Sequence, residues 1–170
     1  MKRIIVALIA ITVLAASTVA CSSAARAARK AEEAAYAADI KKAFTDMELC
    51  VMVTQIIPQS GSAISSNDGY KIKIHDGKVT CRLPFFGSVN TTTIGDIDQS
   101  IVFEETPMQN IKRAMDEKGG EFVISFEARN SAGRMTKVAM DIFDNGVVRM
   151  SCDATGTSHM GYTGEVVIEK

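Results

Sequence analysis

The sequence predicts an all-β domain: an antiparallel meander of seven to eight strands, barrel-like with lipocalin-type topology or folded as a sandwich, preceded by an N-terminal α-helix. Two observations support this fold class. From about residue 48 onward, polar and apolar residues alternate in short runs, which is the period of a half-buried strand. The dipeptides Asp76-Gly77 and Asn145-Gly146 separate such runs and predict two-residue hairpins with both turn residues at positive φ.

The first twenty residues have the pattern of an export signal. Lys2 and Arg3 precede an apolar run over 4–16, which small residues follow. This run is shorter than the roughly 20 residues that cross a membrane, which disfavours a permanent membrane helix. The residues "TVAC", ending at Cys21, resemble a bacterial lipobox, in which the cysteine is acylated and becomes the new N-terminus. We therefore expect a signal peptide over 1–20 and lipidation of Cys21; ordinary signal cleavage beside a chance cysteine is the alternative.

An alanine-rich helical stalk is expected over 21–46, after the lipidated cysteine. Ala, Arg, Lys and Glu dominate here, and Gly and Pro are absent. The second half of the helix carries one apolar stripe, which should dock on the following domain: Tyr36, Ile40, Phe44 and Met47. Residues 22–33 can bury only alanine, so a frayed linker is the alternative for this part.

The β-domain is expected over 47–170. Alternation and turn residues predict its strands in this order: 48–57, 70–75, 78–83, 101–105, 121–129, 134–143, 147–154 and 161–170. A long polar loop is expected over 87–100. The segment 107–120 lacks alternation and is expected to be irregular or briefly helical.

Composition restricts the partners. Without the signal peptide, seventeen Lys and Arg stand against twenty Asp and Glu, so the mature chain is mildly acidic. Because it has no excess of basic residues that would attract the phosphates of nucleic acid, we do not expect nucleic acid as a partner. No Cys/His spacing of the metal-site type occurs, so no metal and no cofactor are expected. The expected attachment is to a membrane, through the N-terminal lipid.

Three cysteines remain if Cys21 carries lipid: Cys50, Cys81 and Cys152. An exported protein can form disulfides, and one bridge among the three is possible. Cys81 and Cys152 fall in register with inward-facing apolar residues, and this favours free thiols in the core.

No residue pattern predicts a catalytic centre, so no enzyme and no catalytic residue are expected. His75 stands beside a turn, and His159 lies next to Ser158 without any sign of a base reaching a nucleophile through space. The acidic run 96–98 lacks the spacing of a calcium loop. The alternative function is an envelope-acting hydrolase that uses carboxylates of the 90–105 loop.

The candidate ligand-binding residues are Phe85, Phe86 and Tyr162. Pro84 ends a strand, so the two following rings should lie at the mouth of a small barrel, where an apolar ligand could enter. The alternative is that the rings only fill the core. We expect a non-enzymatic periplasmic module that binds a small apolar ligand or an envelope protein.

Four short motifs resemble an uncharacterised lipoprotein family of Bacteroidota, domain of unknown function 4251. In order, they are "LPFFG" (83–87), "IVF" (101–103), "FDNGVVRM" (143–150) and "MGYTG" (160–164), within a resemblance over 47–170. The family implies an exported, lipidated all-β domain and brings no activity, ligand or catalytic residue. In such bacteria, surface-exposed lipoproteins tend to carry acidic residues after the lipidated cysteine. Here "CSSAARAARK" has none, which implies an outer-membrane anchor facing the periplasm.

Overall fold

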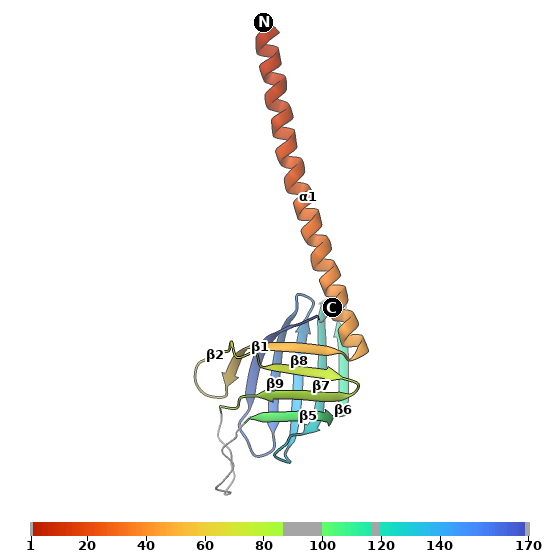
Figure 1. The fold of residues 1–170 in the computed structure, drawn as a ribbon, viewed down its shortest axis with the longest axis vertical. Helices are drawn as coiled ribbons and strands as arrows, with labels where there is room; N and C mark the ends of the chain where they lie inside the picture. The colour runs from red at the N-terminus through yellow and green to blue at the C-terminus, as the bar shows by residue number, and fades with distance from the viewer. Residues whose placement is uncertain (1, 87–99, 117–119, 169–170) are drawn as a thin grey trace. The chain divides into compact units, whose positions relative to one another are not determined.

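The computed structural model describes three stretches of the chain: residues 2–86, 100–116 and 120–168, with side chains from residue 24 onward (Figure 1). Two compact units are present, Met1–Tyr36 and Ala37–Lys170. The first unit belongs to helix α1 (Lys2–Asp46). The second unit contains the last turns of α1 and every strand in the described residues.

Ten strands occur in the part of the chain that the structure describes: β1 (Leu49–Pro58), β2 (Ile64–Ser65), β3 (Lys71–His75), β4 (Lys78–Leu83), β5 (Ile101–Pro107), β6 (Gln109–Asp116), β7 (Glu121–Arg129), β8 (Met135–Phe143), β9 (Val147–Ala154) and β10 (Met160–Val166).

One antiparallel sheet contains all of these strands. Nine follow the path β5-β4-β3-β1-β10-β9-β8-β7-β6, and β2 pairs with β1 beside it. The first and last strands of the domain, β1 and β10, are hydrogen-bonded to each other, while β5 and β6 form the two ends of the path. The strands around β3 to β5 cross those around β7 to β9, and the sheet curls into a nearly closed barrel (Figure 1). The predicted meander, its barrel form and the preceding helix are confirmed.

Strand β6 corrects the expectation of an irregular or helical segment over 107–120. All eight of its side chains are exposed, so it lacks the apolar alternation by which a strand is recognised in a sequence. Its Gln, Lys, Arg, Ala and Met residues favour a helix on their own, but pairing with β7 holds them extended. This strand contains a bulge, where Asn110 has a φ of 51°, and it also carries Lys112. Bulges and lysines are typical of sheet edges that avoid further pairing.

The two predicted hairpin turns differ in type. Asp76 (φ 49°) and Gly77 (φ 71°) form the expected two-residue turn between β3 and β4. Between β8 and β9 only Gly146 has a positive φ (88°), and its N–H donates to the Phe143 carbonyl at 2.9 Å. The expectation that Asn145 also has a positive φ was therefore wrong, because the turn is one residue wider.

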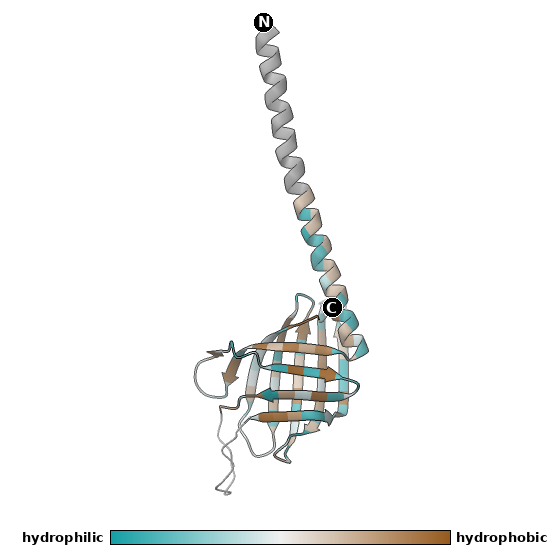
Figure 2. Ribbon diagram, in the orientation of Figure 1, coloured by the Kyte–Doolittle hydropathy of each residue, from teal (hydrophilic) through white to brown (hydrophobic). Residues whose placement is uncertain are grey.

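Apolar side chains fill the barrel interior. Along β3 and β4, buried and exposed residues alternate strictly, and the brown and teal bands in Figure 2 follow this alternation. The largest side chains with less than 2 % exposure come from both halves of the barrel: Tyr162, Phe103, Phe126, Ile72, Ile74, Leu83, Ile124, Met140 and Ile142. Full burial of each such side chain contributes about 1.5–3 kcal/mol to stability.

The end of α1 packs on this core. Ile40 is fully buried and Phe44 is 3 % exposed, with the Phe44 and Phe122 ring centroids 5.3 Å apart. Arg113 donates hydrogen bonds to the carbonyls of Phe44 and Thr45 and lies over the Phe44 ring. The predicted docking of the helix stripe is confirmed for Ile40 and Phe44.

Candidate functional site

The aromatic residues predicted to bind a ligand divide between the core and the surface. Tyr162 is 1 % exposed and Phe85 8 %, whereas Phe86 is 51 % exposed. The Tyr162 hydroxyl donates a 2.8 Å hydrogen bond to the Pro84 carbonyl, so its side chain ties β10 to the end of β4. Burial raises the pKa of Tyr162, which keeps this donor protonated. Tyr162 and Phe85 therefore act as structural supports of the barrel. The side chain of Cys21 lies outside the described residues.

Cys50, Cys81 and Cys152 form no disulfide in the described part of the chain, and all three are buried. Burial raises the pKa of the Cys81 thiol to about 12, and burial also raises the pKa of Cys152 well above its ordinary value. The Cys81 thiol donates towards the Ile101 carbonyl at 3.7 Å. A thiol must ionise to become a nucleophile, so Cys81 and Cys152 are not set up for covalent chemistry.

The other residues considered for catalysis are scattered. His159 Nδ1 lies 2.6 Å from Asp153 Oδ1 on the exposed hairpin between β9 and β10. Residues 96–98 lie outside the described residues, while Glu104 and Glu105 are exposed on β5. Within the described stretches, no three His, Cys, Asp or Glu side chains gather as metal ligands.

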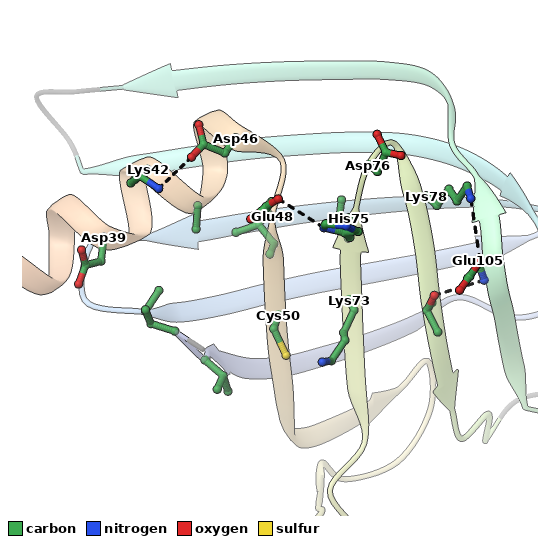
Figure 3. A pocket seen from close by; sticks show the side chains of 16 residues that line it. Asp39, Lys42, Asp46, Glu48, Cys50, Lys73, His75, Asp76, Lys78 and Glu105 are labelled. Atoms are coloured by element: carbon green, nitrogen blue, oxygen red, sulfur yellow. Dashed lines mark hydrogen bonds and ion pairs between the residues drawn. The ribbon is translucent and has the colours of Figure 1, made fainter. Parts of the chain in front are cut away.

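A pocket of about 590 Å³ opens on the outer wall of the barrel (Figure 3). We call it the outer-wall pocket. It lies between the last turns of α1, the start of β1, the β3–β4 hairpin, β5 and the residues that follow β10. Its charged lining includes Asp39, Glu48, Lys73, His75, Asp76 and Glu105. None of the three aromatic candidates lines this pocket.

Strand register places the outward side chains of this pocket in two rows. Cys50 pairs with Lys73, and Lys73 pairs with Thr80, so these three lie across β1, β3 and β4. In the second row His75 Nδ1 lies 3.4 Å from Glu48 Oε1, and His75 pairs with Lys78 across the hairpin. The even spacing of polar residues in β3 and β4 therefore builds the pocket wall.

A bulge brings β5 to the edge of the same pocket. The β4–β5 register shifts by one residue between Val79 and Cys81, and Glu105 has a φ of 45°. The Glu105 N–H donates to Thr80 Oγ1 at 3.2 Å, and the Glu105 carboxylate lies 3.9 Å from Lys78 Nζ. Both contacts hold the Glu105 side chain at the pocket rim.

The opposite wall is the C-terminal end of α1. Met47 has a φ of 58°, its N–H donates to the Phe44 carbonyl, and the Glu48 N–H donates to the Ala43 carbonyl at 2.9 Å. This pair of bonds is the Schellman pattern that ends a helix and turns the chain into β1. It sets Asp39, Lys42 and Asp46 beside the strands, with Lys42 and Asp46 paired at 3.2 Å.

The pocket has an excess of negative charge. Five carboxylates face three lysines, which leaves two net negative charges while His75 is neutral: Asp39, Asp46, Glu48, Asp76 and Glu105 against Lys42, Lys73 and Lys78. This site was not predicted from the sequence. His75 was interpreted as a turn residue, and the signal that could have found the pocket is the run of polar residues on the outward face of one hairpin.

A second, smaller pocket of about 400 Å³ lies over β6 and β7. It is lined by both polar residues and the apolar Ile111 and Phe126, and Lys112, Glu127 and Lys137 supply its charges. No helix in the described part of the chain is both long and apolar enough to cross a membrane.

The arrangement defines a structural class of protein, in which an N-terminal helix precedes an antiparallel, barrel-shaped β-domain with a charged pocket on its outer wall. The chain belongs to the family described as Domain of unknown function (DUF4251), whose profile matches residues 31–166. The family that the four motifs indicate is thereby confirmed.

A solved structure supports the fold. The chain resembles a DUF4251 family protein from Bacteroides eggerthii DSM 20697, with a TM-score of 0.61, 16 % identity and coverage of 81 % of this chain and 90 % of that chain. At this identity the likeness concerns the fold alone. No curated protein matches the chain.

Proposed function

We propose that this protein is a lipid-anchored, non-enzymatic binding module of the cell envelope, and that its ligand or partner binds in the outer-wall pocket. One observation carries the proposal. Apolar side chains occupy the barrel interior, whereas a cavity of about 590 Å³ lies open on the outer wall, which is within the size range of ligand sites. This geometry favours the outer wall over the Phe85 and Tyr162 cluster, whose members are almost fully buried.

The chemistry of the pocket supports binding over catalysis. Lys42 and Lys78 are each within ion-pair distance of a carboxylate, and Glu48 faces His75. Paired, solvent-exposed charges of this kind suit recognition, whereas catalysis calls for acids and bases whose pKa values are moved apart by burial. The thiols with strongly raised pKa values, Cys81 and Cys152, do not line the pocket.

The anchor is part of the same proposal. The signal-like segment over 1–20 and the lipobox-like "TVAC" support acylation of Cys21, followed by the helix that leads to the barrel. The lack of acidic residues after Cys21 supports an outer-membrane anchor that faces the periplasm. A module held there would meet its ligand or partner on the periplasmic side.

Native mass spectrometry of the exported chain with Cys21→Ser tests the binding proposal. We expect an adduct on this protein and its loss in Thr80→Trp, because Thr80 lines the pocket and a large ring there would occupy it. Thr54→Trp is the matched control, since Thr54 is also an exposed strand threonine whose hydroxyl makes one 3.2 Å hydrogen bond. An adduct that survives Thr80→Trp, or a clean mass at micromolar concentration, would contradict binding in this pocket.

A further inference from the structure

We infer that the outer-wall pocket takes a small organic cation, a primary amine that carries an apolar chain. The inference rests on the proposed function and assigns the chemical class of its ligand. It follows from three features of the pocket: carboxylates without a partner, an apolar floor and a rim that holds its own lysines in ion pairs.

Two carboxylates of the pocket have no partner among the described residues. The side chains of Asp39 on α1 and Asp76 at the hairpin tip make no hydrogen bond or ion pair there. In Figure 3 they lie on different sides of the pocket, one on the helix wall and one on the strand wall. By contrast, the carboxylates of Asp46 and Glu105 each face a lysine. An entering ammonium group therefore finds acceptors that no side chain in the described stretches occupies.

Part of the pocket lining is apolar, and we call this part the floor. It consists of Ala43 on α1 and of Val167 and Ile168 after β10, which are half-buried, whereas the Leu49 and Ile74 side chains are 2 % exposed and face the barrel core. The Val167 N–H donates to the Cys50 carbonyl at 2.7 Å, which fixes Val167 and Ile168 beside β1. A hydrocarbon chain can lie on this floor while its ammonium group reaches the rim.

An anion suits the pocket poorly. The lining carries two more carboxylates than lysines, and two of its three lysines already have carboxylate partners. A carboxylate or phosphate would have to displace these partners and approach the excess negative charge. The negative charge of the pocket favours an ammonium group, and its apolar floor favours a hydrocarbon chain. The pocket should therefore bind an amine with an apolar chain more tightly than an acid of the same length.

The test is an NMR titration of the mature chain carrying Cys21→Ser with three probes: n-hexylamine, ethylamine and hexanoate. We expect n-hexylamine to bind with a millimolar Kd and to shift the amides of β3 and Asp76. Ethylamine should bind several-fold more weakly, because it lacks the chain that covers the floor. Hexanoate should cause no saturable shift at these amides.

Substitution of the two unpaired carboxylates tests the contact. Asp39→Asn/Asp76→Asn should weaken n-hexylamine binding about fivefold, because one solvent-exposed charge contact is lost and the pocket as a whole becomes less negative. Asn tolerates the positive φ at residue 76, so the hairpin is retained. The matched control, Asp68→Asn/Glu165→Gln, removes two exposed carboxylates outside the pocket and should leave binding unchanged.

The outcomes separate this inference from the proposed function. Equal binding of hexanoate, or unchanged n-hexylamine binding in Asp39→Asn/Asp76→Asn, would overturn the assignment of a cation. If an adduct is lost in Thr80→Trp but n-hexylamine does not bind, the binding module stands and the ligand class is wrong. If neither the adduct nor n-hexylamine depends on the pocket, both fail.

Discussion

Replacing Gly164 by alanine is expected to destabilise the barrel by about 2 kcal/mol, because the methyl group has no space. Gly164 lies on β10 opposite Val53, where the β1–β10 register shifts. A Cβ at this position would collide with the Met52 carbonyl oxygen and come within 3.0 Å of a Val51 methyl carbon. Since Met52 belongs to a paired strand, its backbone can move away only by disturbing the β1–β10 ladder.

The magnitude follows from two opposing effects. Forcing an extra methyl group into packed surroundings costs about 1–3 kcal/mol, while Gly→Ala gains about 0.4–1 kcal/mol by restricting the unfolded chain. At Gly164 the collision is with backbone, so the upper part of the cost applies. At Gly161 the nearest atom is Ile57 Cβ at 3.2 Å, so a shift of a few tenths of an ångström near the end of β1 relieves the contact. Gly161→Ala is therefore expected to change stability by less than about 0.5 kcal/mol.

Urea unfolding of the mature chain with Cys21→Ser, followed by circular dichroism, measures both variants. The urea midpoint should fall by about 1 M for Gly164→Ala and stay nearly constant for Gly161→Ala, given typical urea m-values. Both glycines lie on β10, so the difference between the urea midpoints of the two variants measures the effect of the collision with the β1 backbone. Equal midpoints for the two variants would refute the steric argument.

Three further outcomes are expected. Tyr162→Phe should lower the free energy of unfolding by about 1–3 kcal/mol, since it leaves the Pro84 carbonyl without its donor, and no loss in a urea titration would contradict this role. Between pH 9 and pH 12 Cys81 should contribute about 1 kcal/mol per pH unit to the fall in the free energy of unfolding, because its raised pKa keeps it protonated in the folded barrel while the unfolded thiol ionises; Cys81→Ala should reduce the slope by this amount, and Cys152 and Tyr162 should maintain the rest. Cys21→Ser should release the exported protein from the membrane fraction, and unchanged fractionation would argue against a lipid anchor.

The fold could be predicted from the sequence wherever one side of a strand faces the core. In β3 and β4 every second residue is buried, and their alternation gave the correct strands and the turn at Asp76-Gly77. The prediction was wrong for β6, because all of its side chains are exposed and its extended form depends on pairing with β7. Asn145 was assigned a positive φ because the same dipeptide fits two turn types, and only the hydrogen bond from Gly146 distinguishes them.

The candidate site was less predictable, because its residues come from distant parts of the chain. Asp39 lies on the helix, Glu48 begins β1, and Glu105 reaches the pocket only through a bulge. Aromatic residues at the end of β4 were the more obvious candidates, but Phe85 is buried and Tyr162 bonds to the Pro84 carbonyl. Periodicity indicates that a side chain faces outward; it does not show which outward side chains meet.

The pairing of β1 with β10 sets the order in which the barrel can be completed. Val51 on β1 pairs with Val166 on β10, so the β1–β10 ladder can form only after the last strand is available. A chain that emerges N-terminus first from a translocation channel therefore cannot close the barrel until translocation is nearly finished. Until then β1 can pair with β3 on one side, while its other edge, which later binds β10, stays open along a strand rich in apolar residues. In the proposed export, a chaperone that shields the open edge of β1 should raise the yield of folded protein, and a truncation before Met160 should accumulate as an aggregating intermediate.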